Sequence, residues 1–284
     1  MLYKDMMKRC IQCMLVILLA CYSHAQLIHT TYSIDAPIVQ DLVKISDPGT
    51  IILINIDQTI ITSKSKMFRY NNNPYRTFIQ DLIFNTKNTP VLNKALSTFL
   101  RHRQVMLVEP AIPDFIEKLK NTGALVFGLY QTTIDERKVI KNSEEWHYQE
   151  LQSLAINFTE RVNNKDIIIL GPKNSHTLFY KGILFTGALS KDGALIELMR
   201  VTNIVPRKVI VFDCNIEDLR RAIYSLRLFD IEYYPIQYLA ERKLEGIPNA
   251  DIVRLQQDSL ILNNVWLEDD EAEKLLQPQL HEAK

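Results

Sequence analysis

The chain has 284 residues, of which 47% are hydrophobic, and only 8 Gly and 11 Pro. This composition excludes a disordered or fibrous chain, and the length suits one α/β domain, since such folds of about 200 to 250 residues are routinely a single domain. The 33 Lys and Arg balance the 33 Asp and Glu, so no strong positive field is available to attract a nucleic acid, and we expect no nucleic-acid partner.

Residues 1–25 have the pattern of a signal peptide. A basic pair, residues 8–9, precedes an apolar run, residues 11–20, which is too short to span a bilayer of about 30 Å. Residues 23–25 have the small-x-small form that signal peptidase accepts, whereas residues 18–21 resemble a bacterial lipobox that ends in Cys21. We therefore expect an exported protein, periplasmic or secreted, without a transmembrane segment after leader removal; the alternative is a lipid anchor on Cys21.

Predicted strands and helices alternate along the rest of the chain. Three apolar runs that follow turn-forming residues read as buried strands, at 50–56, 124–129 and 208–212. Helical patterns occur at 112–120, 134–155, 191–201 and 216–226. This alternation predicts an α/β fold, a Rossmann-like three-layer sandwich with a mostly parallel sheet, whose ligand site lies beyond the carboxyl ends of the strands.

The alternation is interrupted after the first strand. Residues 60–108 are polar and aromatic with one helical stretch, and we predict a cap-like helical insertion over the site. Within it, residues 101–103 (Arg-His-Arg) form a basic cluster that we expect to be a solvated helix face. The domain is expected to span 26–275, and residues 276–284 to form a C-terminal tail that follows a short acidic surface helix.

The residues at the ends of the predicted strands and at the starts of the predicted helices carry most of the chemistry. Because the carboxyl ends of parallel strands meet at one edge of a sheet, these side chains are expected to share a crevice. Along the chain they are Asn55, Asp57, Thr59, Tyr130, Thr132, Lys191, Asp213 and Asp218.

This series resembles the motifs of the haloacid dehalogenase-like superfamily. In that superfamily the first strand ends in Asp-x-Asp-x-Thr, and this chain has Asn55, Asp57 and Thr59 at the three positions. The resemblance implies that Asn55 holds the position of the nucleophile, Asp57 that of the acid/base, and Thr59 that of a conserved hydroxyl. The first carboxylate of the motif is therefore missing.

The remaining motifs match in part. The superfamily has a Ser or Thr for phosphate after the second strand, where this chain has Tyr130, with Thr132 as a substitute. Lys191 matches the lysine that neutralises phosphate, although it could equally be a surface lysine. Asp213 matches the first of two aspartates for Mg²⁺ and could equally cap a helix, while Cys214 replaces the second. The side chains left for a metal are Asn55, Asp57, Asp213 and Asp218.

Features outside these motifs resemble a smaller group. They include Glu109-Pro110, Trp146, residues 182–185 (Gly-Ile-Leu-Phe) and Trp266-Leu267. Together they are similar to an uncharacterised family of exported bacterial proteins, domain of unknown function 2608.

The amide at position 55 decides the functional expectation. A carboxylate can attack phosphorus, whereas an amide lacks the charge, and loss of a nucleophile costs about 10⁶ in rate in subtilisin. We therefore expect a degenerate, non-catalytic member, a pseudophosphatase that binds a phosphorylated ligand or a protein partner, with at most weak Mg²⁺ binding. The alternatives are a metal-dependent phosphohydrolase with residual activity through Asp57 and Asp213, and a host-directed interaction protein whose crevice has no role.

Overall fold

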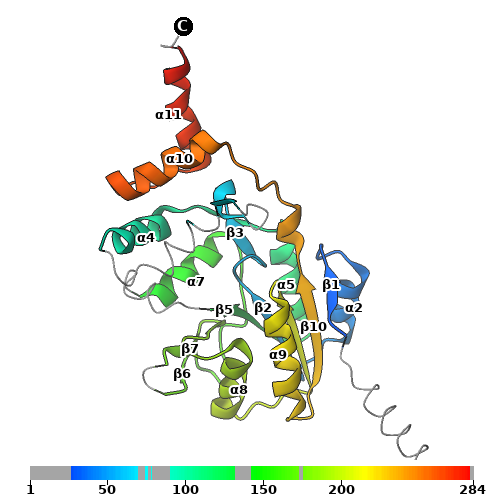
Figure 1. Ribbon diagram of the computed structural model, residues 1–284. Helices are drawn as coiled ribbons and strands as arrows, with labels where there is room; N and C mark the ends of the chain where they lie inside the picture. The colour runs from blue at the N-terminus through cyan, green and yellow to red at the C-terminus, as the bar shows by residue number, and fades with distance from the viewer. Residues whose placement is uncertain are drawn as a thin grey trace, which may run out of the picture.

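A twisted, mostly parallel sheet runs through the centre of the computed structural model (Figure 1). The structure describes residues 27–69, 74–75, 78, 90–131, 142–172 and 175–281. Within them the sheet has eight strands, in the order β1 (His29–Thr31), β10 (Glu232–Tyr238), β9 (Lys208–Asp213), β2 (Thr50–Asn55), β5 (Leu125–Tyr130), β8 (Ile183–Phe185), β7 (Thr177–Tyr180) and β6 (Ile167–Leu170). The first six strands are parallel, and the last two are antiparallel to their neighbours.

Helices cover both faces of this sheet. On one face lie α2 (Pro37–Ile45), α5 (Ile112–Asn121) and α7 (Ser143–Ser153), and on the other lie α8 (Lys191–Thr202) and α9 (Ile216–Arg227). The three central strands, β9, β2 and β5, are apolar on both sides because each face is covered by a helix layer. The predicted α/β class with a mostly parallel sheet is therefore confirmed.

A second, smaller hydrophobic cluster lies beyond the carboxyl ends of the strands. The chain between β2 and α5 forms the antiparallel pair β3 (Ile61–Ser63) and β4 (Val105–Leu107), the short turn η1 (Lys66–Phe68) and helix α4 (Pro90–His102). These elements pack against the C-terminal helices α10 (Ala250–Asp258), η4 (Ser259–Asn263) and α11 (Asp269–His281), and η3 (Ala240–Lys243) leads to them from β10. The cap over the site therefore has two parts, from distant regions of the sequence.

Aromatic rings join the two parts of the cap. Phe68 stacks on Phe99 with ring centroids 4.3 Å apart, and Trp266 meets both rings edge-on at 5.4 and 4.9 Å. The carboxylate of Asp269, at the start of α11, accepts hydrogen bonds from Ser65 Oγ at 2.7 Å and from the backbone of Lys66 at 3.0 Å. The C-terminal acidic segment, expected to be a surface helix, thus holds the insertion in place, and α11 continues past residue 275.

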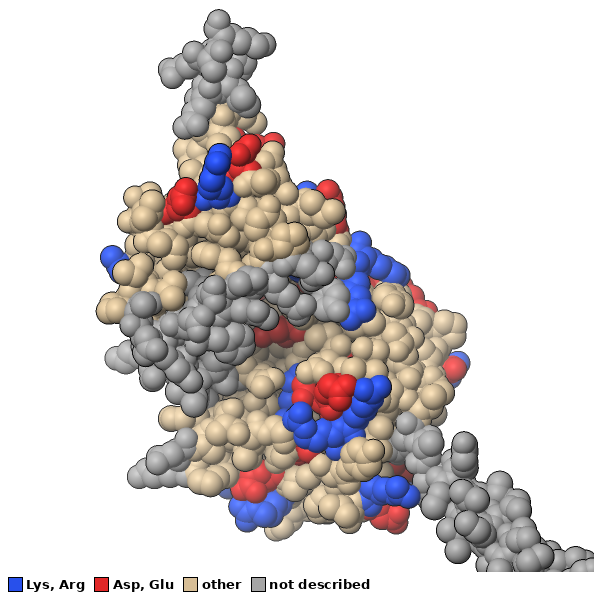
Figure 2. Space-filling view, in the orientation of Figure 1, with Lys and Arg blue, Asp and Glu red and all other residues tan. Residues whose placement is uncertain are grey.

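The structure tests only one of the two expectations about membranes, the absence of a transmembrane segment. Among the described residues, no helix combines the length and the apolar character needed to cross a bilayer. Residues 1–25, with the signal peptide and the alternative anchor at Cys21, lie outside the described residues, so both remain predictions. Acidic and basic side chains lie beside each other in mixed groups on the face that Figure 2 shows.

Candidate functional site

A buried polar cluster lies at the carboxyl ends of the adjacent strands β2 and β9. Lys191, the first residue of α8, donates from Nζ to Asn55 Oδ1 at 2.9 Å and to Asp213 Oδ2 at 2.6 Å. It also forms an ion pair with Asp218 Oδ2 at 3.2 Å, and only 11% of the Lys191 side chain is exposed. The structure therefore brings these four predicted residues together, and the interpretation of Lys191 as a surface lysine is wrong.

The neighbours of Asn55 fix the orientation of its amide. Asn55 Nδ2 donates to the Asp57 carbonyl oxygen at 2.6 Å and to Thr59 Oγ1 at 3.2 Å, while Oδ1 accepts from Lys191. A carbonyl can only accept and an ammonium can only donate, so the two ends of the amide cannot be exchanged. An amide satisfies both neighbours at once, whereas a carboxylate at position 55 would turn an acceptor toward the Asp57 carbonyl.

The electrostatics of the cluster keep Lys191 protonated. Burial by itself would lower the pKa of Lys191, but the attraction of Asp213 and Asp218 outweighs burial and raises it. Burial raises the pKa of the Asp213 carboxyl above its usual value despite Lys191. Burial, reinforced by the negative charge of Asp213, also raises the pKa of Cys214 to about 12, so the thiol stays protonated at neutral pH.

Local capping explains why the cluster sits at helix starts. Ser190 is the N-cap of α8 and accepts from the backbone of Gly193 at 3.3 Å, which places Lys191 in the first turn. Asn215 caps α9 in the same way, through the backbone of Glu217. Asp213 accepts from the backbone of Asn215 at 2.9 Å with its other oxygen, so it braces the turn before α9 while it pairs with Lys191.

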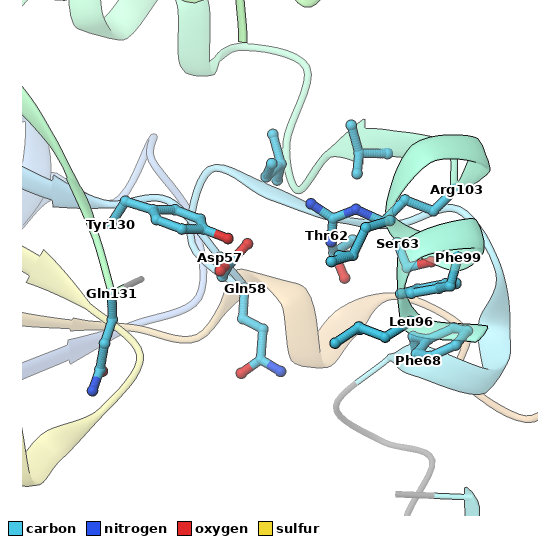
Figure 3. A pocket seen from close by; sticks show the side chains of 13 residues that line it. Asp57, Gln58, Thr62, Ser63, Phe68, Leu96, Phe99, Arg103, Tyr130 and Gln131 are labelled. Atoms are coloured by element: carbon cyan, nitrogen blue, oxygen red, sulfur yellow. The ribbon is translucent and has the colours of Figure 1, made fainter. Parts of the chain in front are cut away.

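A cavity of about 230 Å³ separates the sheet edge from the cap. Asp57, which follows β2, and Tyr130, the last residue of β5, lie at one end of it, together with Gln58 and Gln131 (Figure 3). The Tyr130 hydroxyl and the Asp57 carboxylate point toward one another in this view. The Tyr130 ring packs against the His147 ring, with ring centroids 3.9 Å apart.

The cap supplies the other end of the cavity. Phe68, Leu96 and Phe99 form an apolar wall, and Arg103 adds a charged group. The Arg103 side chain is 13% exposed, pairs with Glu150 at 3.3 Å and lies 5.5 Å from the centroid of the Trp146 ring. The expectation that residues 101–103 form only a solvated face is therefore wrong for Arg103. This residue follows the last residue of α4, and its backbone N–H still donates to the Phe99 carbonyl at 2.8 Å, so helical spacing places it on the side of Leu96 and Phe99.

The cavity and the buried cluster are distinct spaces. Lys191, Asp213 and Asp218 border a gap of only about 10 Å³, close to the volume that one water needs. Thr59 is 1% exposed and accepts the hydrogen bond from Asn55. Of the predicted phosphate-binding residues, Tyr130 lines the cavity, Lys191 and Thr59 lie in the buried cluster, and Thr132 falls outside the described residues.

The donor set fits a metal ion poorly. The oxygens of Asn55, Asp213 and Asp218 already surround the ammonium of Lys191, and the Asp57 carbonyl accepts from the Asn55 amide. Nowhere in the described part of the chain do three or more His, Cys, Asp or Glu side chains gather as metal ligands. Mg²⁺ prefers oxygen donors that are free to coordinate it, and here the oxygens are engaged by protein cations and amides.

Comparison with known proteins identifies relatives but no established activity. The model of the family described as "Protein of unknown function (DUF2608)" matches residues 31–273. "Uncharacterized protein RP296" of Rickettsia prowazekii is 40% identical over 264 residues, which cover 93% of this chain and 96% of the relative. A Chlamydia trachomatis protein named "Putative outer membrane protein" is 27% identical over 156 residues, 55% of each chain. No solved structure matches.

Proposed function

The chain belongs to the DUF2608 family of proteins of unknown function, and from that starting point we propose that it is an exported, haloacid dehalogenase-like protein that binds a small ligand without turning it over. The proposal makes three claims, about the fold, about the ligand site and about export. The three claims rest on separate observations and are tested by separate experiments.

The hydrogen bonds of Asn55 carry the proposal. The residue occupies the end of the first central strand, where the superfamily has its nucleophile, and its amide is engaged on both sides by Lys191 and by the Asp57 carbonyl. Such a group has neither the negative charge nor the exposed lone pairs that attack on phosphorus requires. The surrounding residues complement an amide, which supports a site adapted to Asn rather than one that waits for a carboxylate.

The position of Lys191 argues against the metal-dependent alternative. Its ammonium lies among the oxygens of Asn55, Asp213 and Asp218 that a metal would need. To bind Mg²⁺ there, the site would have to expel a buried, hydrogen-bonded cation, which is costly. We therefore propose that residual phosphohydrolase chemistry through Asp57 and Asp213 is absent.

Turnover is the direct test of a non-catalytic site. Purified protein is incubated with p-nitrophenyl phosphate and millimolar Mg²⁺, and release of p-nitrophenol is followed against a buffer control. The proposal expects no release above the control. Steady turnover by the unaltered protein that Asp57→Asn abolishes would overturn it.

Export is supported by the leader pattern and by one relative. Residues 1–25 have the basic, apolar and small-residue sections of a signal peptide, and the Chlamydia relative bears a name that refers to the outer membrane. Mass spectrometry of the mature protein from a bacterial host that exports it tests the point. We expect an N-terminus at Gln26; a lipid-modified Cys21 would support the anchored form, and an intact Met1 would contradict export.

A further inference from the structure

The two parts of the cap are joined by one buried carboxyl group, that of Glu268. This residue lies just before α11 and is 2% exposed. Its Oε1 accepts hydrogen bonds from the backbone N–H of Gln104 at 2.7 Å and from Trp266 Nε1 at 2.8 Å. Gln104 directly precedes β4, in the insertion between β2 and α5, whereas Trp266 and Glu268 belong to the C-terminal part. A single oxygen atom therefore bridges two segments that are distant in the sequence.

The other oxygen of the Glu268 carboxyl group has no donor. Oε2 is buried and has no hydrogen-bond partner among the described residues. A carboxylate spreads its charge over both oxygens and can only accept, so part of this charge is left without a donor. A protonated carboxyl group is neutral, and a neutral group costs far less to bury than a charge. The surroundings of Glu268 thus favour its protonated form.

The interface between the two parts of the cap contains a second oxygen without a donor. Gln256 on α10 is fully buried; its Nε2 donates to the Leu267 carbonyl oxygen at 3.0 Å and to Asp269 Oδ1 at 2.9 Å. Its Oε1 has no partner among the described residues. The interface therefore has fewer donors than its buried acceptors need, and a proton on Glu268 reduces the shortage.

The charged groups around Glu268 do not neutralise it. Burial raises the pKa of Glu268 above its usual value, and the negative charge of Asp269 adds to this effect. The hydrogen bonds from Trp266 and Gln104 and the attraction of Lys64 oppose it without reversing it. The ammonium of Lys64 donates to the Gln104 side chain at 2.9 Å. Other charged groups of the neighbouring segments have partners of their own: Lys66 pairs with Glu245 at 3.2 Å, Arg103 pairs with Glu150 at 3.3 Å, and Glu271 accepts from the backbone of Glu268 at 2.8 Å.

Both groups that donate to Glu268 lie next to the cavity. The residues on either side of Gln104 line the cavity. Trp266 packs edge-on against Phe68 and Phe99, which form the apolar wall. A change in the charge of Glu268 therefore acts on both parts of the cap where they border the cavity.

We propose that the Glu268 carboxyl group is a pH-sensitive clasp, which holds the two parts of the cap together while it is protonated and loosens them when it ionises. Because the pKa of Glu268 is raised in the folded protein, the stability that the protonated group contributes is lost as pH rises through that pKa. The loss begins near the ordinary value of a glutamate, about 4.3, and continues to higher pH. The inference goes beyond the proposed function and does not depend on it, since the clasp would act in a catalytic and in a non-catalytic protein alike.

Glu268→Gln keeps the shape of the protonated group and removes its titration. Differential scanning fluorimetry compares the variant with the unaltered protein from about pH 4 to about pH 8, and groups that titrate alike in both proteins cancel in the difference of melting temperatures. We expect the variant to become the more stable of the two as pH rises, by about 2 °C or more at about pH 8. Glu273→Gln, at an exposed position of α11, is the matched control and should show no such trend. A difference that stays constant or falls as pH rises would overturn the clasp.

The fluorescence of Trp266 reports on Glu268 directly, because the indole N–H donates to the titrating group. The second tryptophan of the chain, Trp146, has its ring 4.7 Å from that of His147, so Trp146→Phe removes a reporter that a histidine would disturb. In this background the emission should change in a step whose midpoint lies above about 4.3, and Glu268→Gln should abolish the step. A midpoint at or below that value, or a step that survives Glu268→Gln unchanged, would refute the assignment.

Hydrogen exchange tests whether the cap opens by itself. In the unaltered protein at about pH 8, protection should be lower for α4 and α10 than for the central strands, because a cap that opens locally exposes its amides without global unfolding. At the same pH, Glu268→Gln should raise the protection of α4 and α10 several-fold, since its neutral side chain keeps the cap closed. Equal protection of the cap and the central strands in the unaltered protein, or a variant whose cap exchanges as before, would contradict the proposal.

Discussion

The substitution Asn55→Asp would introduce the carboxylate that the haloacid dehalogenase-like motif has at this position, and we expect it to destabilise the folded protein. An oxygen would replace Nδ2, which lies 2.6 Å from the Asp57 carbonyl oxygen. Two acceptors would then face each other in a buried place, while Lys191 could stabilise only the other oxygen of the new carboxylate. The variant therefore needs a cation between position 55 and the Asp57 carbonyl.

The size of the effect follows from the lost hydrogen bond. A buried acceptor without a donor costs about 1 to 3 kcal/mol. For a protein of this size, each kcal/mol lowers the melting temperature by roughly 2 to 4 °C, so we expect a fall of roughly 2 to 12 °C. If Mg²⁺ binds the folded variant with a dissociation constant of about 1 mM, then about 10 mM Mg²⁺ raises the free energy of unfolding of the variant by about 1.4 kcal/mol.

Differential scanning fluorimetry with and without MgCl₂ at constant ionic strength measures both effects. The unaltered protein should not respond to Mg²⁺, and Asn263→Asp, a substitution at an exposed position of η4, serves as a control for the added charge. An Asn55→Asp variant that is as stable as the parent and insensitive to Mg²⁺ would refute the hydrogen-bond argument. Stabilisation of the unaltered protein by Mg²⁺ would refute the role given to Lys191.

Three further substitutions or modifications follow from the same geometry. Lys191→Met leaves the Asp213 carboxylate buried without its cation, and we expect this to lower the free energy of unfolding, measured in urea at pH 8, by about 3 to 5 kcal/mol. Burial already raises the pKa of the folded Asp213 carboxyl, loss of the attraction of Lys191 raises it further, and the stability that a raised folded-state pKa contributes is lost as pH rises through that pKa. The deficit of the variant should therefore be smaller at pH 5 than at pH 8, and an equal deficit would contradict the pairing. Because its pKa is about 12, the Cys214 thiol should react with iodoacetamide at pH 8 roughly 10³-fold more slowly in the native than in the unfolded protein. Mass spectrometry of the peptide that contains Cys214 measures both rates, and equal rates would contradict its burial. Phe99→Ala removes a ring between Phe68 and Trp266 and should cost about 3 to 5 kcal/mol, whereas a cost under about 1 kcal/mol would show that the cap cluster is loosely packed.

The central strands could be predicted because their sequences reflect burial on both faces. β2, β5 and β9 are buried on both faces, so they are continuous apolar runs between turn residues. The strands β10 and β1 carry no such signal. β10 contains Pro235, which cannot donate to a ladder, and β1 is the short polar sequence His29–Thr31 at the sheet edge.

The buried cluster could be predicted from the sequence for a geometric reason. Asn55 and Asp213 end neighbouring parallel strands, and Lys191 opens a helix on the covered face, so topology alone brings the three groups together. What the sequence could not give was the separation of this cluster from the cavity. That depends on how far Lys191 reaches into the gap between Asn55 and Asp213, a matter of side-chain conformation and not of pattern.

The second half of the cap comes from the far end of the chain. Trp266 meets Phe68 and Phe99, and the carboxylate of Glu268 accepts from the backbone of Gln104 at 2.7 Å and from the Trp266 indole at 2.8 Å. No local pattern near residue 100 indicates a partner more than 150 positions away. The periodicity of α4 does predict an inward face. Arg103, one residue after α4, continues the helical spacing of Leu96 and Phe99, and this spacing is the sequence signal that Arg103 lies on the cavity side.

Because the buried cluster and the cavity are separate, substitutions in the two places are expected to have different effects. Asn55, Lys191 and Asp213 satisfy one another without a ligand, so changes there should act first on stability. Asp57 and Tyr130 line the cavity, and changes there should act first on binding. In an active phosphatase of the haloacid dehalogenase-like type, both roles would fall on the same side chains, because the nucleophile and its cationic partner would meet the substrate. Under the proposed function, the amide at position 55 separates the two roles, so the charged cluster serves stability and the cavity serves binding.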